Sequence, residues 1–292
     1  MTLSNEETLV LATRRSPLAK RQAEMTRAAL AAWPQAWWQS IELLELTTTG
    51  DKQRDWSLSA EGGKGLFTRE LEEALLSGKA HLAVHSSKDL PTTLPEGLAL
   101  AGFLPRADAR DVLVRRVDVK IPGKIASGSP RRRAQAEKWW PNAEWTELRG
   151  NLDTRLKKIA NGEADATFLA AAGLHRLGIE SFEGLVFEPI SIEKMVPAAG
   201  QGAIGLESRM EDAAKFSAAF CSKTAHAVFI ERAALTAMGG GCHAASAAYF
   251  DGEVLHVFHA PKGRAVFAVD KSDAAVAVAE TTSAITQWIG IS

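Results

Sequence analysis

The sequence predicts an α/β protein made of two lobes, followed by a smaller α+β domain. Two observations predict the lobes: strand and helix patterns alternate in two successive runs, and the glycine-rich segment 197–202 leads into a strand that can return to the first run. A third predicts the last domain, because residues 223–292 contain three strand-like runs between two helical patterns. We place the first domain at residues 1–104 and 203–222, the second at 105–202 and the third at 223–292.

In the first lobe, three strands alternate with two helices. Ser16-Pro17 separates the first strand from the first helix, because serine is a preferred N-cap and proline is tolerated at the first helical position. Such alternation implies a largely parallel sheet with ligands beyond the carboxyl ends of its strands, where residues 85–89 lie. The expected elements are strands at 8–13, 41–46 and 82–84 and helices at 18–33 and 66–76, the second closed by Gly78.

The second lobe repeats this pattern, and Ser129-Pro130 repeats the cap-and-proline signal. Its expected elements are strands at 124–126, 145–148 and 166–170 and helices at 131–140 and 151–160, with Asn151 as a cap and Gly162 at the end. A strand at 203–207 returns to the first lobe. The third domain is expected to contain helices at 224–238 and 274–289 around strands at 245–250, 254–260 and 265–269.

Composition excludes several classes of protein. A chain of 292 residues with 46% hydrophobic and 24% charged residues is globular rather than disordered or fibrous. No stretch reaches the roughly 18 consecutive apolar residues of a membrane span, and the first residues lack a signal-peptide pattern, so we expect a cytoplasmic protein without membrane contact. Cys221 and Cys242 have no CxxC spacing, which gives no sign of a metal site or a disulfide framework.

Charge is unevenly distributed along the chain. Residues 101–160 contain fourteen Lys and Arg against seven Asp and Glu, a net charge of +7 in a protein whose total is -1. A solvated basic face is the usual explanation of such a run, and composition alone favours it over an anion-binding surface. The basic residues lie at strand ends and helix starts without interleaved aromatics, so we expect no nucleic-acid partner.

Two junctions favour anion binding more specifically. Residues 13–17 and 127–132 each place hydroxyl groups and arginines at a helix N-terminus, where unpaired N–H groups and the helix dipole attract negative groups. Either serine alone is explained as a simple cap, whereas two such sites on two lobes favour a polyanion. Nucleotides are weakly supported, because neither G-x-x-x-x-G-K-[ST] nor G-x-G-x-x-G occurs.

Two further residues are candidates for chemistry. Asp89 follows Lys88 at the end of a strand, where an ionised carboxylate among cations can stabilise a developing positive charge; a helix cap or a salt bridge to Lys88 is the simpler explanation. Cys242 follows three glycines, which let a ligand or the backbone approach closely. Cys221, on an apolar helical face, is expected to be an ordinary buried cysteine.

Seven segments, in the same order, resemble the porphobilinogen deaminase (hydroxymethylbilane synthase) family. Any one of them is a weak signal, but together they are specific and span nearly the whole chain. They are residues 12–19 (ATRRSPLA), 62–67 (GGKGLF), 83–89 (AVHSSKD), 148–151 (LRGN), 171–178 (AAGLHRLG), 197–203 (PAAGQGA) and 240–242 (GGC).

The resemblance implies a fold and a reaction. Members have three domains, the first two arranged like type II periplasmic binding proteins, and a dipyrromethane cofactor joined by a thioether to a cysteine of the third, which implies Cys242 as the attachment point. The family deaminates four porphobilinogen molecules and joins them head to tail into 1-hydroxymethylbilane, releasing ammonia, in tetrapyrrole (heme) biosynthesis. The growing chain is a polycarboxylate, which fits the basic segment.

The resemblance also implies roles for individual residues. Asp89 corresponds to the catalytic residue, and no metal is implied. This chain departs from the family at Ser127, Pro130, Gly239 and Ala244-Ala245, which bears on the conformation of the cofactor loop. The expected cofactor-binding residues besides Cys242 are Lys88, Ser129, Arg131 and Arg132; the substrate-binding residues are Arg14, Ser16, Ser86, Arg149, Arg155, Arg176 and Gln201; Lys64 and Phe67 belong to a possible lid.

Two other functions remain open. A two-lobed anion-binding protein without catalysis would share the fold, but it would normally carry an export signal and would not need Cys242. A cysteine hydrolase would need a histidine base; His243 is adjacent, yet neighbouring side chains of an extended chain point to opposite faces. We expect a monomer acting on a small-molecule substrate.

Overall fold

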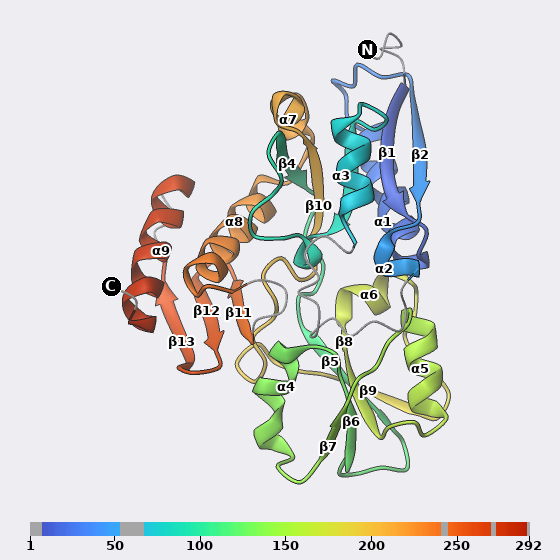
Figure 1. Ribbon diagram of the computed structural model, residues 1–292, viewed down its shortest axis with the longest axis vertical. Helices are drawn as coiled ribbons and strands as arrows, with labels where there is room; N and C mark the ends of the chain where they lie inside the picture. Colours follow the sequence, from blue (N-terminus) through green and yellow to red (C-terminus); the bar gives the residue numbers. More distant parts are fainter. Residues whose placement is uncertain (1–7, 53–66, 241–244, 270–272, 291–292) are drawn as a thin grey trace. The chain divides into compact units, whose positions relative to one another are not determined.

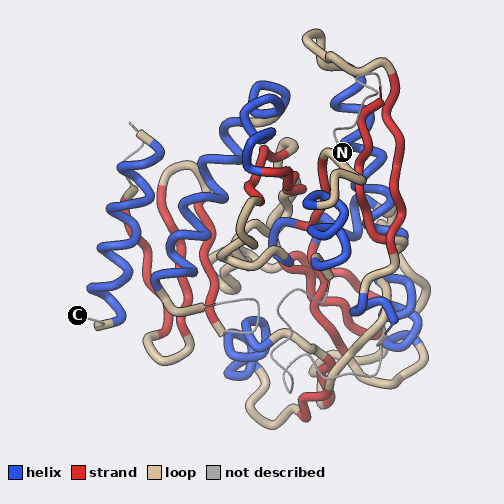
Figure 2. Tube along the Cα trace, turned by 45° about the horizontal axis from the view of Figure 1, so that its top comes forward, coloured by secondary structure: helices blue, strands red, loops and turns tan. Residues whose placement is uncertain are grey.

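The computed structural model describes residues 8–52, 67–240, 245–269 and 273–290. Three separate sheets organise the chain (Figure 1; Figure 2). The described residues fall into two compact units, the first containing residues up to 106 together with 203–225, the second containing 107–202 together with 226–292.

The first unit is built on a five-stranded sheet with the order β2-β1-β3-β10-β4. Strands β1, β2 and β3 run parallel, whereas β10 is antiparallel to both β3 and β4. The returning strand expected at 203–207 is therefore confirmed as β10. The strands are β1 (Thr8–Arg14), β2 (Ser40–Leu46), β3 (Leu82–Ser86), β4 (Leu98–Phe103) and β10 (Ile204–Arg209).

Two helices cover opposite faces of this sheet, as Figure 1 shows. Helix α1 (Pro17–Ala31) begins after Ser16, whose hydroxyl accepts a hydrogen bond from the amide of Ala19, so the predicted cap is confirmed. Alternate strand residues face each helix, with Leu82 and Val84 on the α1 side. Ala83 packs on the opposite side, on α3 (Arg69–Leu76). Shorter helices are α2 (Thr49–Lys52), η1 (Ser87–Asp89), η3 (Met210–Asp212), α7 (Ala213–Phe216) and η4 (Ser217–Ala219).

The second sheet has the order β7-β6-β8-β5-β9. Strands β6, β7 and β8 are parallel, and β5 is antiparallel to β8 and β9. The strands are β5 (Asp111–Arg116), β6 (Lys124–Ala126), β7 (Glu144–Thr146), β8 (Ala166–Ala170) and β9 (Leu185–Pro189); the helices are α4 (Pro130–Ala136), η2 (Glu137–Trp139), α5 (Leu152–Ala160) and α6 (Ala171–Arg176).

The third sheet is an antiparallel meander in the order β11-β12-β13. Helices α8 and α9 pack against it around a common core that contains Ile230, Leu255 and Ile285 (Figure 2). A smaller apolar cluster joins this sheet to the second one, because Val196 packs on Ala247 and Phe258. The elements are α8 (Ser222–Ala237), β11 (Ser246–Phe250), β12 (Val254–His259), β13 (Gly263–Ala268) and α9 (Ala274–Ile289).

The predicted fold class is confirmed: two α/β sheets are followed by a small α+β sheet. Strands β4, β5 and β9 were not predicted, since they carry no clear period and follow loops. The helix expected at 131–140 ends earlier, at Ala136, and continues as one short 3-10 turn. Within the described residues, no helix combines the length and the apolar character that crossing a bilayer requires.

Candidate functional site

In the first unit, several predicted site residues line one small cavity. Its volume is about 80 Å³, and it opens at the carboxyl ends of β1 and β3. Parallel strands present their carboxyl ends at one edge, which is why residues distant in sequence meet there. The lining residues are Arg14, Ser16, Leu18, Ala19, Gln22, Phe67, Thr68, Val84, His85, Ser86 and Asp89.

Arg14, at the end of β1, is already paired within the chain. Its Nη2 lies 2.5 Å from Oδ1 of Asp51, and its Nε donates to Oδ2 at 3.3 Å. The guanidinium carbon lies 4.2 Å from the centre of the Phe67 ring, a cation–π contact. A substrate carboxylate that uses Arg14 must therefore compete with Asp51.

Asp51 is held ionised by this arrangement. Burial acts to raise the pKa of its carboxyl, but the hydrogen bond and charge of Arg14 outweigh burial, and the pKa lies below its ordinary value. The amide and hydroxyl of Thr48 also donate to Oδ2, at 3.2 and 2.8 Å. The turn that carries Asp51 also packs closely, because a Cβ on Gly50 would lie 2.3 Å from the Phe67 ring.

The end of β3 delivers the predicted catalytic residue. The Ser86 hydroxyl accepts from Nε2 of the Gln22 side chain in α1 at 2.9 Å and lies 3.3 Å from its Oε1, to which it can donate. The chain then turns through η1, where the amide of Ser87 donates to the carbonyl of Ala203. Asp89 lies exposed at the end of this turn, and Lys88 is half-buried. The cavity thus combines a cation, hydroxyl groups and an exposed carboxylate.

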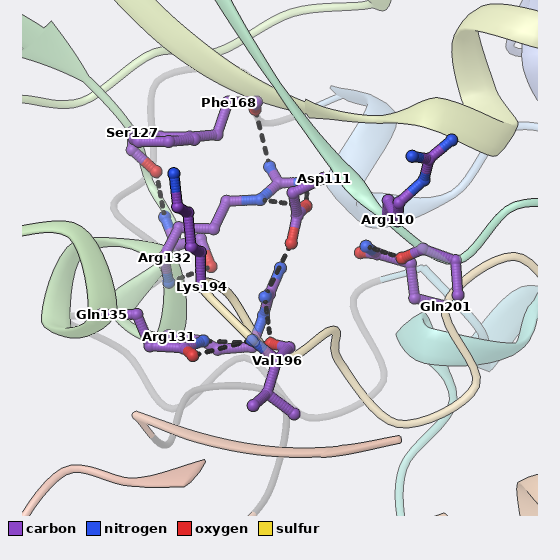
Figure 3. A network of polar contacts seen from close by, with 12 residues as sticks. Arg110, Asp111, Ser127, Arg131, Arg132, Gln135, Phe168, Lys194, Val196 and Gln201 are labelled. Atoms are coloured by element: carbon purple, nitrogen blue, oxygen red, sulfur yellow. Dashed lines mark hydrogen bonds and ion pairs between the residues drawn. The ribbon is translucent and has the colours of Figure 1, made fainter. Parts of the chain in front are cut away.

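In the second unit, a buried carboxylate holds two predicted site residues (Figure 3). Asp111, at the start of β5, is 0% exposed. Its Oδ2 accepts from Nη1 of Arg131 at 2.8 Å, and its Oδ1 accepts from Nε of Arg132 at 2.9 Å. The hydroxyl of Ser129 caps α4 by accepting from the amide of Arg132 at 3.4 Å. Both arginines are more than nine-tenths buried, so the helix start is fixed before any ligand binds.

The two arginines differ in what they leave available. Arg132 uses all three nitrogens, with Nη1 on the carbonyl of Phe168 and Nε and Nη2 on Asp111. Arg131 uses only Nη1, which also reaches the carbonyl of Val196, and its Nε and Nη2 make no hydrogen bond to other described residues. Burial lowers the pKa of Arg131. Arg131 is therefore the better placed of the two to bind an anion.

Gln135 ties α4 to the segment before the third sheet. Its side-chain oxygen Oε1 accepts from the backbone amide of Val196 at 2.9 Å, and its Nε2 donates to the carbonyl of Val196 at 3.0 Å. Glu231 of α8 makes a similar connection, since it accepts from the amides of Gly200 and Phe250 at 2.7 and 2.9 Å. The glycine-rich segment is thus fixed on both sides.

Arg176, at the end of α6, is a buried cation. It is 8% exposed, and its Nη2 donates to the carbonyl of Gly202 at 2.6 Å. Its Nε has no hydrogen-bond partner among the described residues, and no carboxylate there pairs with it. Burial alone lowers its pKa to about 10. Such a group favours a bound anion, because a negative partner would offset its lost hydration.

The remaining predicted arginines are more exposed. Arg149 pairs with Glu147 at 3.2 Å, and Nε of Arg155 donates to the carbonyl of Gly150 at 2.8 Å. Gln201 is fully buried, and its amide donates to the carbonyl of Ala109 at 2.7 Å. These contacts do not test whether Arg149, Arg155 and Gln201 bind substrate, so their roles stay predictions.

Cys242 and Lys64 lie outside the described residues. The chain next to the cysteine is nevertheless informative. Gly239 has a φ of +64°, and a Cβ on Gly240 would lie 2.9 Å from the side chain of Leu235. Both positions therefore favour glycine.

Sequence reasoning missed Asp111, Gln135 and Glu231. Asp111 begins a strand that was not assigned, and its only signal was an aspartate heading an apolar run, DVLV. Among the described residues, no group of three or more His, Cys, Asp and Glu side chains could hold a metal ion.

Comparison with known proteins identifies the family. Residues 9–216 match the family model described as "Porphobilinogen deaminase, dipyromethane cofactor binding domain". A porphobilinogen deaminase from Syntrophus aciditrophicus is 42% identical, with 85% of this chain and 82% of the relative covered. One from Sphingopyxis alaskensis is 43% identical, covering 82% and 79%. The chain belongs to the porphobilinogen deaminase family. The resemblance predicted from seven short segments is thereby confirmed.

Solved structures show a looser likeness. The aliphatic sulphonate binding protein SsuA from Escherichia coli aligns with 96% of this chain and 87% of its own, at 14% identity and a TM-score of 0.45. The periplasmic VFT2 domain of BvgS from Bordetella pertussis aligns with 74% and 86%, at 16% identity and a TM-score of 0.44. At these scores the likeness has no bearing on function.

Proposed function

We propose that this member of the porphobilinogen deaminase family is a hydroxymethylbilane synthase. It deaminates porphobilinogen and joins four molecules into 1-hydroxymethylbilane on a dipyrromethane cofactor. The observation that carries the proposal is the cavity of the first unit, which gathers Arg14, Ser16, Ser86 and Asp89. The resemblance to the family had implied a role in this reaction for each of the four.

The second unit supplies groups that fit a cofactor rich in carboxylates. Arg176 is a buried cation without a carboxylate partner among the described residues, and Arg131 is a second buried cation, which donates to Asp111 and to Val196 from Nη1. Arg131, together with Lys88, Ser129 and Arg132, would hold the acetate and propionate groups of a dipyrromethane attached to Cys242, and Arg176 would bind a carboxylate of the substrate. When bound, dipyrromethane supplies the free pyrrole carbon to which the first substrate is joined.

Asp89 is proposed to act on the charge that develops in the substrate. Loss of ammonia from porphobilinogen leaves a cationic, azafulvenium-like ring, and an ionised carboxylate that accepts from the pyrrole N–H stabilises it. The exposed position of Asp89 beside the cavity keeps the carboxylate hydrated until substrate arrives.

The arginines are proposed to position the substrate through its two carboxylates. Arg14 would exchange Asp51 for a substrate carboxylate, with Ser16 and Ser86 as hydroxyl donors at the same cavity. Arg149, Arg155 and Gln201 belong to the same proposal, for the growing chain. Phe67 and Lys64 are proposed as part of a lid. The Phe67 ring, which contacts the Arg14 guanidinium, would line the cavity side of that lid.

The experiment that tests the proposal measures ammonia and bilane together. Wild-type protein incubated with porphobilinogen should release one ammonia per porphobilinogen consumed and yield a product that cyclises to a fluorescent porphyrin after acidification. Asp89→Asn should lower the rate by about 100-fold or more. Asp153→Asn, which removes an exposed ion pair with Lys157, is the matched control and should leave the rate unchanged.

An anion-binding protein without catalysis would bind porphobilinogen and release no ammonia.

Three further predictions belong to the proposal: a cytoplasmic location, a monomeric state, and a division into three domains in which residues 223–292 form the third. Sedimentation of the purified protein would test the monomer.

A further inference from the structure

A cluster of buried titratable groups lies beside the cavity of the first unit and has no part in the chemistry proposed so far. His85 of β3 and Glu207 of β10 lie diagonally across the two strands, since Gly205 is the register partner of His85. His85 is on the face covered by α3, because its neighbour Val84 packs on the α1 side. Glu72 of α3 completes the cluster and interacts electrostatically with both.

All three side chains are more than nine-tenths buried. Glu207 is 0% exposed, His85 5% and Glu72 8%. Nε2 of His85 lies 3.0 Å from Oε2 of Glu207. Within the described residues none of four buried atoms has a hydrogen-bond partner of good geometry: Nε2 of His85, both carboxylate oxygens of Glu207, and Oε1 of Glu72.

Burying these three groups together costs folding free energy, which a purely structural role would not explain. A buried ion pair seldom stabilises a fold more than apolar residues of the same size would, and it costs more when a carboxylate oxygen is left unpaired. Glu72 adds a second carboxyl to the same dry space. Burial, with the negative charges of Glu207 and Glu70, raises the pKa of Glu72 despite its hydrogen bond with Thr68 and the nearby His85. Glu72 therefore retains a proton more readily than a carboxyl group in water would.

The cluster also reaches the reaction site. His85 lines the same cavity as Asp89 and Arg14. Because Nε2 faces Glu207, Nδ1 is the ring nitrogen left for the cavity side. An imidazole in this position can accept a proton at Nδ1 while it passes the proton on Nε2 to the carboxylate, or do the reverse.

The reaction needs such a group. The departing amine leaves as ammonia, which takes up a proton to become ammonium, and a proton is released later, when the newly joined cationic ring loses the hydrogen of its α-carbon. The two events balance over one cycle but occur at different moments. Asp89 cannot supply the first proton while it remains ionised to stabilise the cationic ring.

We propose that His85, backed by Glu207 and Glu72, is the proton store of the cavity. The imidazolium gives the proton from Nδ1 to the departing ammonia and becomes the neutral ring, which keeps its proton on Nε2 beside the Glu207 carboxylate. The imidazole then takes back the proton that the joined ring releases, so each addition restores the starting state. This inference rests on the proposed synthase activity and adds a second proton-transfer group to it.

Other charged groups lie on the elements next to the pair. Glu70 and Glu72 lie on α3, Arg14 ends β1, and Lys88 and Asp89 follow β3. Glu70 is already engaged, because its Oε1 accepts from the amide and the hydroxyl of Thr49 at 2.7 and 2.6 Å. Glu207 therefore remains the direct partner of the imidazole.

The test compares two substitutions that each convert a carboxylate beside an imidazole into an amide. Glu207→Gln alters the proposed store, and Asp251→Asn alters the His256–Asp251 pair of the third sheet, where the two side chains are 3.1 Å apart. Wild type must first form bilane, because failure at that point contradicts the proposed function rather than this inference. Glu207→Gln should then lower kcat by about 100-fold with little change in KM or in cofactor mass.

The pH profile separates proton transfer from a merely structural effect. In Glu207→Gln the ring loses the carboxylate that lies 3.0 Å from Nε2, so the pH profile of kcat should change. Asp251→Asn should match wild type in both kcat and pH profile. A Glu207→Gln enzyme with wild-type kcat and an unshifted profile overturns the proposal.

A measurement on unaltered holoenzyme covers the case in which the variant does not fold. With ¹⁵N-labelled histidine, the His85 signals should show a proton on Nε2 and should shift when porphobilinogen is added, while those of His256 stay constant. A His85 ring that is neutral, unprotonated at Nε2 and unchanged by substrate from pH 6 to 9 overturns the proposal.

Discussion

At the scale of single residues, buried charges divide into those the fold has already paired and those it has left for a ligand. Asp111 neutralises part of the charge of Arg131 and Arg132, and the three form one network with backbone carbonyls. Arg176 donates to the carbonyl of Gly202, and its Nε has no hydrogen-bond partner in the part of the chain that the structure describes. The same residue type therefore serves two purposes in the second unit, and substitution distinguishes them.

Arg176→Met is expected to leave the ligand-free protein as stable as wild type, or more stable. The change removes a buried cation at the cost of one hydrogen bond, worth about 1 kcal/mol. The KM for porphobilinogen should rise by about tenfold, as a lost charge-assisted contact implies. Asp111→Asn is the contrasting variant: it leaves two buried arginines without their carboxylate and should lower the free energy of unfolding by about 3 kcal/mol. Urea titrations in which both variants lose equal stability would contradict this division.

Asp51→Asn tests the pairing with Arg14 through its pH dependence. The pKa of Asp51 is depressed below 3.8 in the folded state, so the pair contributes stability that is fully present above pH 3.8 and is lost as the pH falls through the folded pKa. Wild type should exceed the variant by about 2 kcal/mol at pH 7, and the difference should shrink below pH 3.8. Unfolding free energies measured across pH 2–7 check this.

The matched control for Asp51 is Asp212, whose pKa is also depressed and which pairs with Arg209 and Lys215. Asp212→Asn should show the same pH pattern of stability but an unchanged KM for porphobilinogen. Asp51→Asn should lower KM, because substrate no longer competes for Arg14. An Asp51→Asn enzyme with a raised KM would show that Asp51 assists binding instead.

Sequence patterns predicted residues at this scale only where local signals exist. Ser16 and Ser129 were predicted as caps, and both accept the expected amide hydrogen bond. Asp111 and Glu207 are different, because their partners are 20 or more positions away or on another strand, and only the fold brings them together. The hydrophobic periodicity of one sequence does not show which distant residues form such pairs.

At the scale of elements, helices were easier to predict than edge strands. Residues 274–289 carry a long apolar stripe between Asp273 and Gly290, and α9 has those bounds. Strand β9 is half-buried and short, and it follows a turn, so its pattern is weak without its neighbour β5. Strands β4 and β5, which were also missed, are likewise antiparallel to their sheet neighbours, whereas the parallel strands β1 and β3 are apolar runs next to helices.

Gly240→Ala tests whether the end of α8 requires a close approach before Cys242. A Cβ there would lie 2.9 Å from the Leu235 side chain and 3.2 Å from its carbonyl oxygen. The free energy of unfolding should fall by about 2 kcal/mol, and cofactor content should fall with it. Gly239→Ala is the control, since its Cβ would meet nothing within 4 Å and only the φ of +64° opposes it, a cost of about 1 kcal/mol. Equal loss of cofactor in the two variants would contradict a specific role of the close contact.

At the scale of the whole molecule, the chain crosses between units more than once. Residues 203–225 return to the first unit after residues 107–202 of the second, and β10 lies between β3 and β4. The first unit therefore cannot complete its sheet until the second lobe has been synthesised. The glycine-rich segment 197–202 predicted this return, whereas the membership of 226–292 in the second unit had no local signal.

The central claim is that this polypeptide carries an oligopyrrole on one sulfur atom and extends it. Intact mass spectrometry of the purified protein is the most direct test. We predict an excess mass equal to dipyrromethane, further steps of one porphobilinogen less ammonia when substrate is added, and no excess in Cys242→Ser. Wild-type protein that keeps the mass of its bare sequence after incubation with porphobilinogen, yet still forms bilane, would contradict the account.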